Sequence, residues 1–199
     1  MNKLITGSDG FLASHLQQHL KMIQYNHRLE EIDINSDLVN ISEIWHFASP
    51  SEDIEFRDDL NTFKSIVIGT ANIIALCKKN NIKLIFASSL AADLPEHQIC
   101  NYGKYKKLAE KMIIYSGIDY CILKIPRVYG KDRKKGLMKK INQNLIHKDD
   151  MHNIVEYLDI SDFINQTLNN TKCKIYYYEN LKQNTITEIK KIYFEGKHE

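Results

Sequence analysis

The first two dozen residues constrain the fold most, because a short apolar run leads directly into a glycine turn and then into an amphipathic segment. Residues 3–6 have the composition of a buried strand, and residues 7–10 form a turn bounded by glycines. Residues 11–23 follow with apolar side chains at helical spacing, namely Phe11, Leu12, Leu16 and Leu20. Glycines between a strand and a helix let the backbone approach a pyrophosphate, whose charge the helix N-terminus stabilises. We therefore predict a dinucleotide-binding loop; a glycine turn without a ligand is the alternative.

The following hundred residues alternate apolar strands with helices. Strands are predicted at residues 43–48, 83–87 and 119–125, and helices at residues 58–80 and 102–116. A weaker strand at residues 29–34 is interrupted by Glu30 and Glu31. This rhythm is typical of βαβ units, so we expect an α/β fold with a Rossmann-like, doubly wound parallel sheet.

After Gly130 the pattern becomes less regular. The remaining predicted elements are a helix at 136–145, a strand at 155–158, a helix at 161–168, a strand at 174–178 and a helix at 185–192. A chain of 199 residues can hold one main domain with a small appended lobe. We therefore divide it into a dinucleotide-binding domain, residues 1–130, and a small substrate-binding lobe, residues 131–199, with elements that return to the core.

A dinucleotide loop usually has an acidic partner about 20 residues further on, where a carboxylate accepts from the ribose hydroxyls. Asp33 lies 23 residues after Gly10 and ends the predicted strand at 29–34. An ordinary surface aspartate is the alternative. Arg28 is near enough to accommodate a 2′-phosphate, so we expect NAD as the cofactor and leave NADP open.

Tyr102 and Lys106 are four residues apart, which places them on one face of a predicted helix. A free phenol has a pKa near 10, and a neighbouring ammonium stabilises its phenolate. Ser89 ends the strand before this helix, so its hydroxyl can hold a substrate oxygen against the tyrosine. A solvated, lysine-rich helix face is the alternative. The glycine loop and the serine strand favour a catalytic site, because ligands of such sheets bind at the carboxyl ends of the strands.

Charge and cysteine spacing exclude several other classes. The 27 basic and 25 acidic residues are scattered, and we interpret the basic run at 131–140 as a solvated surface, so no nucleic-acid partner is expected. The four cysteines form no C-x-x-C pair, which predicts no metal site. No apolar run approaches the roughly 20 residues that span a bilayer, and the N-terminus shows no signal pattern. We expect a cytoplasmic protein without a membrane partner.

Seven segments carry a family resemblance. They are TGSDGFLA at residues 6–13, HFAS at 46–49, GTAN at 69–72, FASS at 86–89, YGKYKKLAE at 102–110, PRVYG at 126–130 and TITE at 185–188. Together they resemble the extended short-chain dehydrogenase/reductase family of NAD-dependent nucleotide-sugar epimerases, dehydratases and reductases, in a shortened form. The similarity spans nearly the whole chain.

The resemblance implies roles for individual residues. Ser89 is the catalytic serine, Tyr102 the general acid/base, and Lys106 the residue that lowers the tyrosine pKa and holds the nicotinamide ribose. Cofactor contacts are implied at Gly7, Asp9, Gly10, Phe11, Leu12, Asp33, Ile34, Phe47, Ala48, Ser49, Ser88, Tyr102, Lys106, Pro126 and Val128. Substrate contacts are implied at Ser49, Ser89, Leu90 and Arg127. Relatives dimerise through the helices matching 58–80 and 102–116, so a homodimer is expected.

Three departures from the family pattern affect these expectations. Only about 30 residues separate the first helix from His46, so a strand-helix unit is reduced or missing, and Asp33-Ile34 matches either the ribose acid or an adenine-flanking pair. Ser65 occupies the position of a structural asparagine, which weakens the proton-relay inference. Leu90-Ala91 follows Ser89 where dehydratases carry an acidic residue, so elimination of water is less expected than epimerisation or reduction.

We therefore predict an NAD(P)-dependent enzyme that acts on a nucleotide-activated sugar, either by 4-keto reduction or by C4 epimerisation. Tyr102 moves a proton while the nicotinamide moves a hydride. The first alternative is a degenerate, non-catalytic dinucleotide-binding sensor or scaffold. A basic binding module built on residues 131–140 is a third, weaker hypothesis.

Overall fold

The computed structural model describes residues 2–25, 27–50 and 58–195, and its main feature is a six-stranded parallel sheet. The strand order is β2-β1-β3-β4-β5-β8. The strands are β1 (Asn2–Thr6), β2 (Met22–Tyr25), β3 (Ile41–His46), β4 (Lys83–Ser89), β5 (Tyr120–Ile125) and β8 (Ile175–Tyr177). The predicted Rossmann-like, doubly wound fold is confirmed. All carboxyl ends of these strands point to one edge, which is where a ligand of such a sheet binds.

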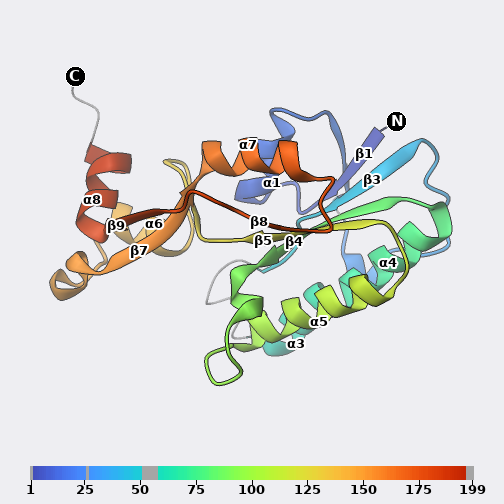
Figure 1. Cartoon of the computed structure of the whole chain (residues 1–199), viewed down its shortest axis with the longest axis horizontal. Coiled ribbons are helices and arrows are strands. Elements are labelled where there is room, and N and C mark those ends of the chain that lie inside the picture. The colour runs from blue at the N-terminus through green and yellow to red at the C-terminus, as the bar shows by residue number, and fades with distance from the viewer. Residues whose placement is uncertain (1, 26, 51–57, 196–199) are drawn as a thin grey trace.

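Helices cover both faces of this sheet, as Figure 1 shows. On one face lie α1 (Phe11–Gln17) and α7 (Ile160–Asn170), and on the other α3 (Asp59–Phe63), α4 (Gly69–Asn80) and α5 (Asn101–Tyr115). Neighbouring strand residues separate into the two cores: Ile85 packs in the cluster with α1 and α7, and Leu84 in the cluster with α4 and α5. Burial on both faces explains why these strands are continuous apolar runs.

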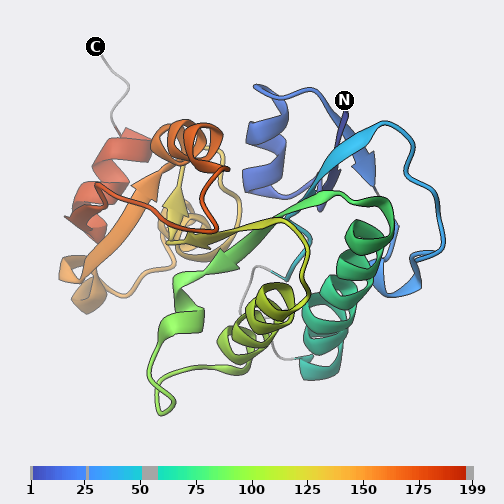
Figure 2. The ribbon, with the colours of Figure 1, turned by 45° about the vertical axis from the view of Figure 1, so that its right-hand side comes forward.

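A smaller lobe lies at the end of the molecule opposite β2, seen at the left of Figures 1 and 2. It contains a three-stranded sheet ordered β6-β7-β9 and its own apolar cluster around Tyr129, Tyr157 and Met138. Its elements are β6 (Val128–Tyr129), α6 (Gly136–Asn142), β7 (Ile154–Asp159), β9 (Lys182–Thr185) and α8 (Ile186–Lys190). Between β7 and β9 the chain returns to the main sheet as α7 and β8. The division at residue 130 remains a prediction.

The second strand is not where the sequence predicted it. Helix α1 ends at Gln17 rather than near residue 23, and β2 pairs with β1 from Lys3↔Met22 to Thr6↔Tyr25. Residues 29–31 form a single 3₁₀ turn instead of the predicted strand. β2 is the edge of the sheet, so the strand that lies outside it in the order 3-2-1-4-5-6 is missing among the described residues. The sheet is therefore shortened on this side, as the small number of residues between the first helix and His46 led us to expect.

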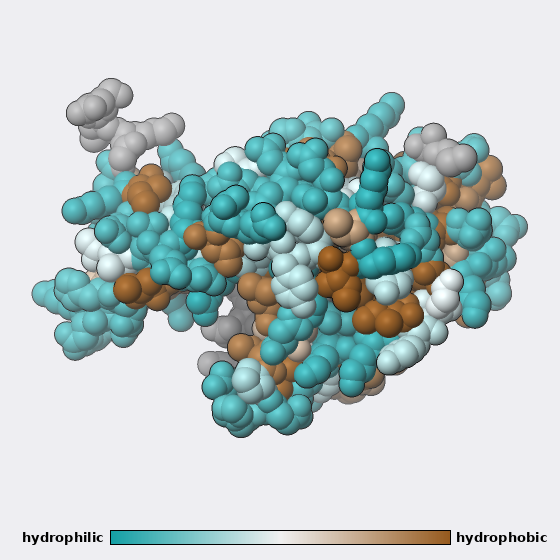
Figure 3. Space-filling view, in the orientation of Figure 1, coloured by the Kyte–Doolittle hydropathy of each residue, from teal (hydrophilic) through white to brown (hydrophobic). Residues whose placement is uncertain are grey.

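The predicted helix at 58–80 is continuous but contains a π-helical turn at Lys64–Ile68 between α3 and α4. Asp58 caps it, because its side chain accepts from the backbone N–H of Asn61. By length and apolar content, Asp59–Asn80 could cross a bilayer. It serves instead as a layer of this fold, since Ile66, Ile73 and Leu76 are buried in the core beneath the sheet. Figure 3 shows a largely hydrophilic face interrupted by separate apolar patches.

Candidate active site

The glycine loop joins β1 to α1 and packs against the carboxyl end of β3. Gly7 has a φ of +69°, and a Cβ there would lie 2.6 Å from the backbone nitrogen of Ala48. Only glycine fits this left-handed position and this close approach. The N–H of Gly10 donates to the carbonyl of Gly7 at 2.9 Å, and α1 begins at the next residue. The loop therefore presents its backbone at the edge where Ala48 and Ser49 leave β3.

His46, the last residue of β3, is buried in the core and connects β3 to β1 and α4 through its ring nitrogens. Its Nδ1 lies 2.9 Å from Oγ1 of Thr6 on β1, and its Nε2 lies 3.1 Å from Oγ1 of Thr70 on α4. The imidazole is fully buried, and burial, with the nearby charge of Lys106, lowers its pKa to about 3. A neutral imidazole can donate to one threonine and accept from the other. His46 thus acts as a structural tie between two strands and a helix.

Tyr102 lies where β3, β4 and α5 meet. Its hydroxyl forms side-chain hydrogen bonds with Ser89, the last residue of β4, and with Ser49, just beyond β3. Gly103 makes the approach of α5 possible, because a Cβ there would lie 2.5 Å from the carbonyl oxygen of Ala91. The structure therefore brings the predicted Ser89, Tyr102 and Ser49 together.

Burial dominates the acidity of the Tyr102 phenol. It raises the pKa to about 12, although the hydrogen bonds from Ser49 and Ser89 and the charge of Arg133 oppose this shift. Tyr102 is therefore a neutral hydroxyl at pH 7 and is ready to donate a proton. The cation that lowers its pKa is Arg133, which we expected in a solvated run, whereas Lys106, the residue expected to have this effect, is not among the groups that shift it.

Lys106 lies one helical turn after Tyr102 and is almost fully buried. Its Nζ donates to the carbonyl of Ala87 at 2.7 Å and lies 5.8 Å from the centre of the Tyr102 ring. Burial lowers the pKa of this ammonium to about 7, against the opposing charge of Glu110. Near neutral pH the side chain is therefore poised between its two charge states.

A partly buried ionic network packs next to this pair, and sequence reasoning missed it. Nζ of Lys124 on β5 lies 2.7 Å from a carboxylate oxygen of Glu110 and 2.5 Å from one of Asp93. Glu110 also accepts from Ser88, and Asp93 accepts from Tyr177 of β8 at 3.2 Å. The network ties α5 to the strand that ends at Ser89 and to the 3₁₀ turn Leu90–Asp93. The lone lysine in the apolar run at residues 120–125 was its only sequence signal.

The other predicted contacts differ in how far they are buried. Phe11, Leu12, Phe47 and Val128 surround the core beneath the glycine loop, whereas Asp9 and Arg127 are exposed. Ser88 is used by the network above, while Leu90 and Pro126 are half-buried. Gly130 lies against Phe11, because a Cβ there would be 2.9 Å from its ring. The segment that follows β5 therefore passes next to the first residue of α1, just after the glycine loop.

Asp33 and Ile34 do not end a strand, because the predicted strand at 29–34 is replaced by a 3₁₀ turn at 29–31. The structure therefore does not bring them to the carboxyl edge of the sheet. The carboxylate of Asp33 accepts from the backbone N–H of Asn35 at 2.9 Å and from Ser36 at 3.1 Å in an exposed turn. The segment runs along α4, from Leu29 beside Asn72 to Leu38 beside Asn80. Since α4 runs back toward the amino ends of the strands, this path leads away from the site.

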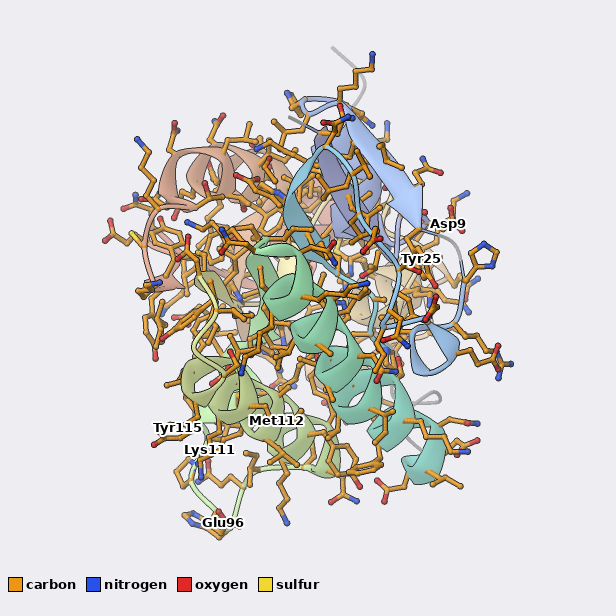
Figure 4. All side chains as sticks on the ribbon, turned by 90° about the vertical axis from the view of Figure 1, so that its right-hand side faces the viewer. Asp9, Tyr25, Glu96, Lys111, Met112 and Tyr115 are labelled. Carbon is orange, nitrogen blue, oxygen red and sulfur yellow. The ribbon has the colours of Figure 1, made fainter. Side chains whose placement is uncertain are left out.

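The carboxyl end of β2 is instead Tyr25, which lies in register with Thr6. Figure 4 places Tyr25 on the same side of the molecule as Asp9 of the glycine loop. The next residues in the sequence are Asn26, His27 and Arg28, none of which is acidic. The residues therefore fit a dinucleotide at the pyrophosphate loop and around Tyr102, but the acid expected at this strand end is absent from the sequence there. No group of three potential metal ligands occurs within residues 2–25, 27–50 and 58–195.

Comparison with known proteins identifies the family. The model of the NAD dependent epimerase/dehydratase family matches residues 3–165. UDP-glucuronic acid decarboxylase 1 of Danio rerio is 28% identical over 113 residues, which covers 43% of this chain and 27% of the relative. The same enzyme of Xenopus tropicalis is also 28% identical, with 26% of the relative covered. The matched region thus spans about a quarter of these curated relatives.

Solved structures share the fold over nearly the full chain. MoeE5 in complex with UDP-glucuronic acid and NAD has a TM-score of 0.83 at 18% identity, covering 99% of this chain and 82% of that one. UDP-glucose 4-epimerase of Thermotoga maritima has a TM-score of 0.78 at 19% identity, covering 98% and 82%. dTDP-4-dehydrorhamnose reductase of Bacillus anthracis with NADP has a TM-score of 0.74 at 19% identity, covering 98% and 81%. The sequence resemblance is confirmed, and this chain belongs to the NAD-dependent epimerase/dehydratase family.

Proposed function

We propose that this protein binds a nicotinamide dinucleotide and catalyses redox chemistry at a sugar carbon of a nucleotide-activated sugar, with Ser89, Tyr102 and Lys106 as its catalytic residues. The observation that carries the proposal is the Tyr102 hydroxyl, which is hydrogen-bonded to Ser89 while the Lys106 ammonium lies beside its ring. The convergence of these three groups at the carboxyl edge of the sheet, next to the glycine loop, supports a reacting centre there.

The residues have separate tasks in the 4-keto reduction. Ser89 donates a hydrogen bond to the ketone oxygen and orients it against Tyr102. The O–H bond of Tyr102 then breaks, and its proton passes to that oxygen, which becomes the product hydroxyl. A reduced nicotinamide, if bound here, would supply the hydride for the new C–H bond at the carbonyl carbon, and its oxidised form would accept a hydride in the reverse direction. Tyr102 regains a proton from solvent, and the reverse transfers oxidise a sugar hydroxyl.

The acidity of the site favours the donating role of the tyrosine. With its pKa raised to about 12, the phenol is fully protonated at neutral pH and can act as a general acid without prior activation. To act as a base it needs a nearby positive charge. Arg133 supplies such a charge, whereas Lys106 lies beside the ring but is not among the groups that shift the Tyr102 pKa, and burial lowers its own pKa to about 7.

The site geometry supports a proposed position for the cofactor. Gly7, Asp9, Gly10, Phe11 and Leu12 would hold the pyrophosphate through the loop backbone and the first turn of α1. The nicotinamide side would be bounded by Phe47, Ser88, Pro126 and Val128, with Lys106 binding its ribose, and Ala48 and Ser49 would lie on the adenosine side. We propose NAD as the cofactor, with NADP as the alternative because Arg28 lies just after β2 and none of the three residues that follow Tyr25 in the sequence is acidic.

The substrate would enter between Ser49, Ser89, Leu90 and Arg127. C4 epimerisation and 4-keto reduction both fit a serine and a tyrosine at one sugar oxygen, whereas Leu90-Ala91 offers no carboxylate for elimination.

We further propose a cytoplasmic homodimer. Leu60, Leu108 and Tyr115 are large apolar side chains exposed on α3 and α5, the helices expected at the dimer interface.

The direct test is turnover of a panel of nucleotide sugars, followed by nicotinamide absorbance and by product analysis for epimers. Tyr102→Phe should reduce turnover by roughly 10²- to 10⁴-fold, the usual contribution of a general acid. Tyr105→Phe is the matched control, because Tyr105 is on the same helix but its hydroxyl binds Asp59 at the surface. Full activity of Tyr102→Phe would refute the assignment.

A non-catalytic dinucleotide-binding sensor or scaffold is the second candidate. It is favoured by the position of Asp33 and by the lack of a strand outside β2 in the described part of the chain, which leave the adenosine side of the site reduced. Its signature would be cofactor binding without turnover of any sugar in the panel. Wild-type and Tyr102→Phe proteins would then bind the cofactor equally and be equally inactive.

A further inference from the structure

Lys106 and Glu110, one turn apart on α5, bind adjacent residues at the end of β4. Nζ of Lys106 donates to the carbonyl of Ala87 at 2.7 Å, and a carboxylate oxygen of Glu110 accepts from the hydroxyl of Ser88. Ser89 follows directly and ends the strand. Side chains four residues apart lie on the same face of a helix. The ammonium and the carboxylate therefore lie side by side between α5 and the strand that carries Ser89.

Lys124 of β5 binds the other oxygen of the Glu110 carboxylate. Lys124 is in register with Ser88 on the neighbouring strand, so its side chain lies on the same face of the sheet, which α5 covers. Its Nζ is 2.7 Å from Oε2 of Glu110, whereas Ser88 binds Oε1. The side chain of Glu110 is 10% exposed and that of Lys124 is 3% exposed. Glu110 is therefore a nearly buried carboxylate that connects α5 to two strands.

Lys106 is charged in surroundings that disfavour a charge. It is 2% exposed, its hydrogen-bond acceptor is a neutral carbonyl, and its Nζ lies 4.8 Å from the centre of the Phe86 ring. Burial lowers its pKa to about 7, and the charge of Glu110 opposes this shift. Other titratable groups on this side of the sheet include His46 of β3, Tyr102 of α5, Lys124 of β5 and Asp93 of the 3₁₀ turn after β4. Glu110 is thus the anion that acts on the Lys106 ammonium.

We propose that Glu110 is a positioning residue for the proposed reaction, whose carboxylate holds the end of β4 against α5 and is the counter-charge of Lys106. This inference rests on the proposed function, because Ser89 and Lys106 are two of its catalytic residues. Glu110 acts through them: its bond to Ser88 fixes the place from which Ser89 begins, and its charge favours the ammonium that would bind the nicotinamide ribose. An ion pair that only stabilises the fold is the alternative, and it predicts no effect on the charge of Lys106.

NMR of the full chain with isotopically labelled lysine side chains measures the titration of Lys106 directly. Its signal is assigned by its absence from Lys106→Met. Glu110→Gln keeps an oxygen that can accept from Ser88 but removes the charge, so the titration midpoint of Lys106 should fall by roughly one pH unit, as for the loss of a neighbouring opposite charge. Glu43→Gln is the matched control, because it removes a part-buried carboxylate that pairs with Lys3 elsewhere in the sheet, and it should leave the midpoint unchanged.

Lys124→Met distinguishes a counter-charge from a structural ion pair. Glu110→Gln and Lys124→Met break the same pair and both lower stability, but Lys124→Met keeps the carboxylate and removes its competing cation. The Lys106 midpoint should therefore stay or rise in Lys124→Met. The double variant Glu110→Gln/Lys124→Met should titrate roughly one pH unit below Lys124→Met, which gives the same comparison if Glu110→Gln does not fold. Equal midpoints with and without the Glu110 carboxylate, or an equal fall in Lys124→Met, would overturn the proposal.

NADH titrations at a series of pH values around neutrality connect the counter-charge to the proposed function. If the Lys106 ammonium binds the nicotinamide ribose, NADH affinity falls as this group loses its proton. Glu110→Gln should move that fall to lower pH by the same amount as the Lys106 midpoint, and Glu43→Gln should not move it. An unmoved affinity profile beside a lowered midpoint would overturn the positioning role. A wild-type protein that does not bind NADH would overturn the proposed function, while the NMR comparison still decides whether Glu110 is the counter-charge.

Discussion

The two sides of the glycine loop differ in how firmly they are built. On the side of β4 and α5, Tyr102 and Lys106 rest on buried hydrogen bonds and on the ionic network of Lys124. On the side of β2, a four-residue edge strand ends at Tyr25, and Asp33 lies in a surface turn. The residues proposed for proton transfer are therefore well supported, whereas the part of the sheet expected to flank the adenosine of a dinucleotide is short among the described residues. We infer that affinity depends mainly on the pyrophosphate and nicotinamide contacts.

The largest expected effect comes from breaking the network behind Tyr102. Lys124→Met leaves Glu110 buried without its cation, and removing one partner of a buried ion pair costs about 3–5 kcal/mol. Chemical denaturation should show this loss in the free energy of unfolding. Lys174→Met is the control, because its ion pair with Asp119 is exposed and should be worth less than about 1 kcal/mol. Equal losses in both variants would contradict the contrast between the two sides.

The glycine loop connects the two sides, and Gly7 is its tightest position. Gly7→Ala combines a left-handed backbone with a Cβ 2.6–2.9 Å from the backbone of Phe47 and Ala48, so we expect a loss of about 2–4 kcal/mol together with weakened dinucleotide binding. Gly117→Ala shares the positive φ but has no atom within 4 Å of its Cβ. It should cost about 1–2 kcal/mol from the backbone alone and leave dinucleotide affinity unchanged. Denaturation and NADH titration measure both quantities.

The burial of His46 predicts a specific loss of stability in mild acid. The pKa of this imidazole falls from about 6.5 in the unfolded chain to about 3 in the folded protein, so its contribution is complete above pH 6.5 and is lost as the pH falls toward 3. Between pH 7 and pH 5 the wild type should lose about 2 kcal/mol more than His46→Gln. His147→Gln changes an exposed histidine and should follow the wild type. Parallel pH profiles for wild type and His46→Gln would refute the buried neutral imidazole.

Sequence patterns predicted the side of β4 and α5 better than the side of β2, for a physical reason. β3, β4 and β5 are buried on both faces, so their apolar runs are long, and the glycine, serine and tyrosine segments lie at their ends. β2 is short and exposed on one edge, and only its pairing with β1 distinguishes it from the end of a helix. Composition alone therefore assigned the strand to residues 29–34.

The charged groups that surround the candidate site were harder to predict than Ser89, Tyr102 and Lys106 themselves. Glu110 and Lys124 are 14 residues apart, and Lys124 and Asp93 are 31 apart, so their contact depends on the packing of α5 against β5 and the turn after β4. Arg133 looked like one cation in a solvated run, because its ring contact with Phe11 joins segments more than a hundred residues apart. The residues of the site follow local spacing, whereas the groups that tune them are set by tertiary structure.

The smallest expected effect is for a substitution on the side of β2. Asp33→Asn removes a carboxylate whose partners are Asn35 and Ser36 in its own turn, on a segment that leads away from the carboxyl ends of the strands. We expect stability to change by less than about 0.5 kcal/mol, as for most surface substitutions, and the affinities for NADH and NADPH to change by less than about threefold. Asp37→Asn, on the same segment and paired with Lys79, is the control. A tenfold loss of NADH affinity in Asp33→Asn alone would restore Asp33 as the ribose ligand and would require the loop to rearrange when the cofactor binds.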